Sequence, residues 1–110
     1  MEKYNGWTNY ATWRINLELL DGYETSIESN IEEFTELVEN GEISDDNRMD
    51  LIINLSQELK SVVEEILDSY DSDSIVRNYA NAFIADVNWY EIAEHKFEDV
   101  VEKIIELSNE

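Results

Sequence analysis

Apolar side chains recur along this chain at the three- and four-residue spacing of amphipathic helices. In three segments they gather on one face when residues are placed at 100° intervals around a helix axis. The apolar stripes consist of Ile27, Ile31, Phe34 and Val38; of Ile52, Leu55, Leu59, Val63, Ile66 and Tyr70; and of Trp89, Ile92, Phe97, Val100, Ile104 and Leu107. No segment alternates apolar and polar residues long enough to indicate a strand. The pattern therefore predicts an all-α protein.

Residues that favour helix ends divide the chain into five predicted helices. The start signals are Thr8 or Asn9, Thr25 with Glu28, Ser44-Asp45-Asp46, Asp71-Ser72-Asp73-Ser74, and Asn88 with Glu91. The predicted helices span about 10–20, 26–40, 45–70, 75–85 and 89–107. Because 110 residues suit one domain, we expect residues 1–110 to form a single compact bundle with acidic outer faces.

The charge of the chain is large and uneven. Its 27 acidic side chains face seven basic ones, which gives a formal net charge of −20. Residues 1–22 and 73–90 each have a net charge of −1, and residues 91–110 reach −5. Residues 23–72 reach −13, because 15 acids face only Arg48 and Lys60. Repulsion by this field excludes direct binding to nucleic acid or to an anionic membrane.

The acidic residues follow the helical period and form three predicted ridges. The ridges contain Glu28, Glu32, Glu36 and Glu39; Glu58, Glu64, Glu65 and Asp68; and Glu91, Glu94, Glu98 and Glu102. A solvated helix face is the ordinary interpretation of such a run. Surface helices usually mix Glu with Lys at this spacing, however, and like charges there cost roughly 0.2–0.5 kcal/mol per pair. The uniform sign therefore favours a partner-binding role for these carboxylates.

Aromatic residues mark two predicted helix starts. Trp7, Tyr10 and Trp13 are spaced three residues apart around the first, and Trp89 lies at the start of the last. Aromatic side chains with a polar edge can lock a helix end by packing and one hydrogen bond. They also dominate the binding energy of many protein interfaces. Both interpretations, a structural lock and an exposed binding patch, remain open.

The segments that hold these aromatic residues resemble a family of small proteins from phages and other mobile elements, whose function is largely unknown. Residues 5–13 read NGWTNYATW, and residues 87–95 read VNWYEIAEH. Both are similar to signatures of that family. The resemblance covers both ends of the chain but not its acidic middle. It implies a role in the conflict between phage and host, and it supplies no catalytic residues.

Signatures of catalysis and metal binding are absent from the sequence. The chain has no cysteine and a single histidine, His95, near the acidic face of its helix. Asp68, Asp71 and Asp73 lack the order, the glycine and the distal Glu of a calcium loop. We therefore expect no metal, no cofactor and no enzymatic activity. No apolar run approaches the ~18 residues of a membrane span, so we expect a cytoplasmic protein, in the host cytoplasm if phage-encoded.

Two classes of function remain. The first is an acidic mimic of nucleic acid, which blocks the DNA- or RNA-binding groove of a host defence complex such as a CRISPR effector or a restriction enzyme. The second is a helical interaction module or homodimer that binds through an aromatic or apolar surface, with acidity serving solubility. Charge reversal of the acidic ridges should abolish the first function and spare the second.

Overall fold

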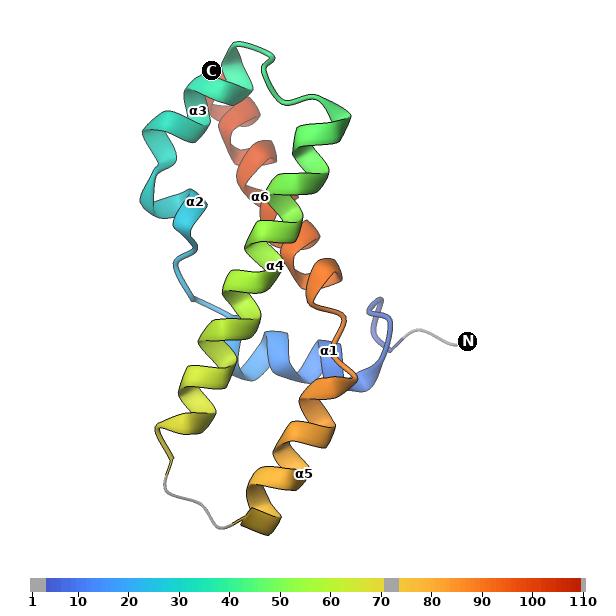
Figure 1. The fold of residues 1–110 in the computed structure, drawn as a ribbon. Coiled ribbons are helices and arrows are strands. Elements are labelled where there is room, and N and C mark those ends of the chain that lie inside the picture. Colours follow the sequence, from blue (N-terminus) through green and yellow to red (C-terminus); the bar gives the residue numbers. More distant parts are fainter. Residues whose placement is uncertain (1–3, 71–73, 110) are drawn as a thin grey trace.

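The protein is built from helices around one apolar core (Figure 1). The computed structural model describes residues 4–70 and 74–109. Among these residues there is no strand, and the elements are α1 (Tyr10–Ile15), η1 (Asn16–Leu20), α2 (Ser26–Ser29), α3 (Ile31–Glu39), α4 (Asp45–Asp68), α5 (Ser74–Ala85) and α6 (Trp89–Ser108). The all-α prediction is confirmed. The described residues form six α-helices and one π-helical segment, η1, where the sequence predicts five helices.

Short polar side chains begin four of these helices, as the sequence predicts. Each accepts a hydrogen bond from a backbone N–H of the first turn; they are Asn9 for α1, Thr25 for α2, Ser44 for α4 and Asn88 for α6. At α2 the side chain of Glu28 completes the predicted capping box. The cap predicted at Asp71-Ser72-Asp73-Ser74 lies, apart from Ser74, outside the described residues.

The second predicted helix is interrupted at Asn30. The backbone of Asn30 leaves helical values (φ −114°, ψ 39°), and its Nδ2 donates a hydrogen bond to the carbonyl oxygen of Ser26 at 2.9 Å. Asn side chains compete in this way with the helical backbone. The single helix predicted over residues 26–40 is therefore two helices, and Glu28 lies on a different helix from the later acids of its ridge.

The first predicted helix changes character partway along. After α1 the chain continues as η1, whose last residue, Leu20, is fully buried. Nζ of Lys96 in α6 donates a hydrogen bond to the carbonyl oxygen of Leu20 at 3.0 Å. The same carbonyl oxygen also accepts the N–H of Tyr23 at 3.1 Å, so this helix end is paired by both a backbone and a side-chain donor. Asp21 and Gly22 (φ 84°) then end the segment where the sequence predicts.

The core lies mainly between α4 and α6. The buried residues of these two helices are Ile52, Leu55, Leu59, Val63, Ile92, Ala93, Phe97 and Ile104. Phe34 of α3 meets Phe97 edge to face, with ring centroids 5.4 Å apart. Figure 1 shows α1 crossing near the start of α6, with α2 and α3 beside its later turns. The predicted apolar stripes thus supply most of the core.

Two of these stripes extend past the core. Tyr70, just after α4, is 68% exposed, and Leu107, near the end of α6, is 62% exposed. The prediction that they share the buried face of their helices is wrong, because the helical period continues beyond the point where another element covers the face. These two side chains contribute surface rather than core.

The helix α5 has no buried residue, although eight of its twelve residues are apolar. The molecule measures 51 × 33 × 26 Å along its principal axes. Figure 1 shows α5 at one end of the long direction and α2 with α3 at the other. In the described part of the chain, no helix is long and apolar enough to cross a membrane.

Candidate functional site

The two terminal motifs meet and join the starts of α1 and α6. Thr12 is fully buried, and its Oγ1 donates a hydrogen bond to Asn9 Oδ1 at 2.7 Å. Oγ1 of Thr12 also accepts a hydrogen bond from the backbone N–H of Asn88 at 2.8 Å. Across the junction, Oε1 of Glu91 accepts the N–H of Thr8 at 2.9 Å. The polar positions of both motifs therefore hold two helix ends together.

Two of the four predicted motif aromatics lie beside this junction. Trp7 stacks on His95, with ring centroids 4.2 Å apart and ring planes 28° from parallel. Trp89 is half-buried against the core. The sequence places His95 near solvent, and it is exposed, but its contact with Trp7 was not predicted. No local pattern signals a contact between residues so far apart in the chain.

Tyr10 and Trp13 belong to a second group of aromatic rings. Both lie against Tyr4, at centroid distances of 5.1 and 5.0 Å. Tyr10 also meets Phe83 of α5 edge to face at 6.1 Å. Tyr4 and Tyr10 are 40% and 43% exposed. One motif therefore contributes both to a packed junction and to an aromatic surface.

Seven of the twelve carboxylates in the predicted ridges have side-chain contacts within the protein. They are Glu28, Glu39, Glu58, Asp68, Glu91, Glu94 and Glu98. Glu28 serves the capping box of α2, and Glu39 accepts a hydrogen bond from Ser108 Oγ at 3.0 Å. Asp68 pairs with Arg77 at 2.6 Å. These contacts stabilise the fold. The seven carboxylates can bind a partner only if the contacts are broken.

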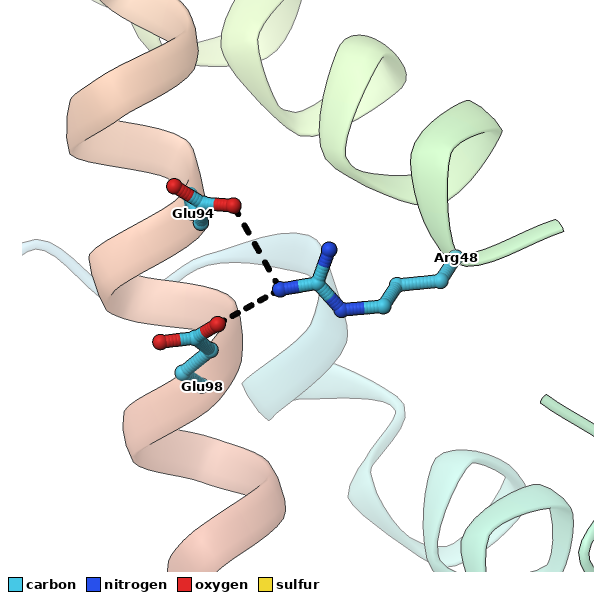
Figure 2. A network of polar contacts seen from close by, with 3 residues as sticks. All are labelled: Arg48, Glu94 and Glu98. Atoms are coloured by element: carbon cyan, nitrogen blue, oxygen red, sulfur yellow. Dashed lines mark hydrogen bonds and ion pairs between the residues drawn. The ribbon is translucent and has the colours of Figure 1, made fainter. Parts of the chain in front are cut away.

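Arg48 links α4 to the acidic ridge of α6 (Figure 2). Its Nη2 lies 2.5 Å from Glu98 Oε1 and 3.4 Å from Glu94 Oε2. The guanidinium carbon also lies 5.8 Å from the ring centre of Phe97. This role of Arg48 was not predicted, although the sequence holds a signal for it: Arg48 is the only Lys or Arg between Arg14 and Lys60.

Glu58 of the second ridge binds groups within the protein, at the start of α2 and in the segment before it. Its Oε2 accepts hydrogen bonds from Tyr23 Oη at 2.8 Å and from the N–H of Ser26 at 3.0 Å. Desolvation first, and then the hydrogen bond to the Glu58 carboxylate, together raise the pKa of Tyr23 to about 12. The neutral phenol is therefore the form that the fold favours.

Five ridge carboxylates are exposed and have no side-chain partner among the described residues. They are Glu32, Glu36, Glu64, Glu65 and Glu102. The first two belong to α3, whose nine residues include four acids and no base. From Glu24 to Asp46 the chain has nine acids and no Lys or Arg. The region of α2 and α3 is therefore the longest stretch of carboxylates that no neighbouring cation in the sequence balances.

An open groove lies between α2–α3 and α6, and neither Glu32 nor Glu36 belongs to its lining. Its volume is about 430 Å³, and its lining is Glu24, Glu28, Ile31, Thr35, Glu39, Val100, Lys103, Ile104, Leu107 and Ser108. Apolar side chains from α3 and α6 face one another across it, and three Glu residues lie at its edges. Lys103 is the single cation of the lining. The lining of the groove thus combines apolar side chains with three carboxylates and one ammonium group.

The described residues contain no group of three or more His, Cys, Asp or Glu that could hold a metal ion. Asp71 and Asp73 of the predicted turn lie outside them. No family model, curated protein or solved structure matches the chain. The site is therefore interpreted from its own residues.

Proposed function

We propose that this protein is a phage-type anti-defence inhibitor, which mimics nucleic acid and occupies the DNA- or RNA-binding groove of a CRISPR effector or a restriction enzyme. The observation that carries the proposal is the position of the uncompensated carboxylates. Glu32 and Glu36 are exposed on α3, a helix with no base, and other residues of α3 border a groove lined by Glu24, Glu28 and Glu39. The likeness of the terminal motifs to phage proteins supports the same class of function.

The spacing of these charges suits a site that binds phosphates. Duplex DNA carries one charge per ~1.7 Å of axis when both strands are counted. A helix with an acid every third or fourth residue carries one charge per ~5–6 Å, because each residue rises ~1.5 Å. Adjacent acidic helices approach the charge density of one edge of a duplex. Arg and Lys that normally bind phosphates can bind carboxylates through the same charge-assisted hydrogen bonds.

The groove adds a second mode of contact to this surface. The stems of Lys and Arg are apolar and pack on apolar surface while their charged ends stay near an anion. Ile31 and Leu107 can receive such stems, and the exposed carboxylate of Glu24, which lines the same groove, can receive their charged ends. A basic nucleic-acid-binding groove offers these side chains in number, so we place the target contact on α2, α3 and the facing turns of α6.

The alternative function is a helical interaction module whose acidity serves only solubility. The exposed apolar residues of α5 favour an apolar interface on this protein. Solubility alone does not explain the position of the acids, however. The segments from Tyr4 to Leu17 and from Ser74 to Ala85 hold exposed aromatic residues but no acid. Charges that served solubility would be most useful beside that surface.

The first test is affinity capture from bacterial lysate with the tagged full-length chain. The column is washed at ~50 mM salt and eluted at ~500 mM salt, because binding through phosphate-like contacts weakens steeply with salt. The proposal predicts that a nuclease or CRISPR effector is retained by the first wash and released by the second. A partner that stays bound at high salt and binds no nucleic acid contradicts it.

A further inference from the structure

We propose that two copies of this chain associate through an aromatic patch formed by Tyr4, Tyr10, Trp13, Tyr79 and Phe83. The patch joins α1 to α5 through the contact of Tyr10 with Phe83. Tyr79 lies one helical turn before Phe83, on the same face of α5. It is 75% exposed, the highest value among the large hydrophobic side chains of the described residues.

The described part of the chain covers the apolar face of α5 only in part, since Phe83 and Ile84 are half-buried against the core. A helix with a broad apolar face normally buries that face, yet none of the residues of α5 is buried. The face centres on Tyr79 and Phe83, and the exposed Ile75 and Val76 lie beside them. The opposite side of the helix carries Arg77 and Asn81, which are joined by a hydrogen bond of 3.1 Å. The aromatic patch therefore occupies one face of α5, and polar side chains occupy the opposite face, as is typical of a helix in an interface.

The distribution of charge favours a second copy of this chain as the partner that binds the aromatic patch. No acid lies between Tyr4 and Leu17 or within α5, and the two arginines there, Arg14 and Arg77, are paired with Glu18 and Asp68. A basic partner is drawn instead to the acids of α2 and α3. Those acids lie at the far end of a molecule 51 Å long. Because charges are screened within ~8 Å at physiological salt, two copies can meet through the acid-free surface of α1 and α5 with little repulsion.

The size of the aromatic patch suits a reversible dimer. Aromatic side chains cover 150–250 Å² each when buried. From the exposed fractions of Tyr4, Tyr10, Tyr79, Ile75 and Val76, each copy can bury about 500 Å², or about 1,000 Å² for the pair, which is the size at which specific interfaces begin. A symmetric dimer of this kind points the two acidic ends away from each other. It leaves both of them open to a target.

The test is sedimentation of the full-length chain over ~1–200 µM, a range that reports micromolar dissociation constants. We expect a species of about twice the 12.9 kDa chain mass at the highest concentrations. Tyr79→Glu should weaken the dimer at least tenfold, because it places a charge at the centre of the interface. Asn78→Glu is the matched control, since it adds the same charge to an exposed position on a different face of α5. It should leave the dimer intact.

The dependence of dimer affinity on salt concentration provides a second test, because the proposal predicts the direction of the change. Since the copies carry like charge, raising salt from ~50 to ~500 mM should strengthen the dimer, whereas binding to a basic target should weaken. A wild-type chain that stays monomeric at ~200 µM overturns the proposal, and so does equal weakening by both variants. Circular dichroism of Tyr79→Glu should match the wild type, because the replaced side chain is mostly exposed. Failure of dimerisation leaves the proposed inhibitor function standing, since that function needs only one acidic end.

Discussion

The two ends of this molecule expose different kinds of surface. At the end formed by α2 and α3, carboxylates are exposed without a base in the same helix, and Phe34 of α3 is buried. At the end formed by α1 and α5, there is no acid in either helix, and aromatic side chains are exposed. A chain that used charge only to stay soluble would place it beside exposed apolar surface. We propose that the two kinds of surface serve two different partners.

The largest expected effect comes from reversing charge at the acidic end. Glu32→Lys with Glu36→Lys should weaken inhibition of the captured target about 100-fold or more, because charge-assisted hydrogen bonds contribute about 1.5–3 kcal/mol each. The measurement is displacement of a labelled duplex from the target. Both side chains are exposed and have no side-chain partner in the described structure, so unfolding is not expected to cause the loss.

The control for this change reverses two other exposed acids, Glu64 and Glu65 of α4. It changes the net charge by the same amount on a helix that does not border the groove. We expect less than about a tenfold effect, since only long-range attraction changes. Equal losses from both pairs would show that overall charge, and not the α3 surface, determines binding.

The next largest effect concerns the junction that separates the two ends. Thr12→Val keeps the shape of the side chain but removes the hydroxyl that bonds Asn9 and the N–H of Asn88. The half-buried N–H of Asn88 is then left unpaired, whereas Asn9 Oδ1 keeps the N–H of Thr12, so the free energy of unfolding should fall by about 1–3 kcal/mol. Urea denaturation measures the change, and Thr12→Ser, which keeps the hydroxyl, should recover most of it. A loss below about 0.5 kcal/mol would contradict the role given to the motifs.

A smaller effect is expected at Arg48. Arg48→Met removes the pairs with Glu94 and Glu98 but keeps an apolar stem near Phe97. Because these charges are partly exposed, the free energy of unfolding should fall by only about 0.5–1 kcal/mol. The loss should shrink in high salt. A thermal melt at two salt concentrations checks both the size and the salt dependence, and a larger loss in high salt would contradict the electrostatic explanation.

The smallest effect is a pH dependence at Tyr23. Its pKa is about 12 in the folded protein and 10.0 in the absence of these interactions. A raised pKa of this kind means that the stabilisation is complete below pH 10.0 and is lost as pH rises toward 12. Tyr23→Phe should therefore lose less stability than the wild type over that interval. In absorbance titration, the variant should lack the last tyrosine to ionise; an unchanged titration would contradict the assignment.

Local sequence signals predicted the helices well where the determining contacts are local. Asn9, Thr25, Ser44 and Asn88 cap helices because their side chains reach backbone groups three residues away. The break at Asn30 also depends on a nearby bond, to Ser26. It was missed because the apolar period continues across it, and periodicity was given more weight than the preference of Asn for helix ends.

Local sequence signals could not predict which acidic residues have partners within the protein. Glu58 and Glu91 have the spacing of exposed ridge positions, yet they bind Tyr23 and Thr8, which lie 35 and 83 residues away along the chain. Only the tertiary fold brings these groups together. Helical position therefore predicted which carboxylates share a face, but not which of them remain available to a partner.

The most direct test of the central claim is competition between this protein and nucleic acid for the captured target. Labelled duplex DNA is bound to the target at ~150 mM salt, and the full-length protein is added at increasing concentration. We predict complete displacement of the duplex, at concentrations that rise steeply with salt. A complex in which the target holds the protein and the duplex together, with an affinity independent of salt, would contradict the claim that the acidic end mimics nucleic acid.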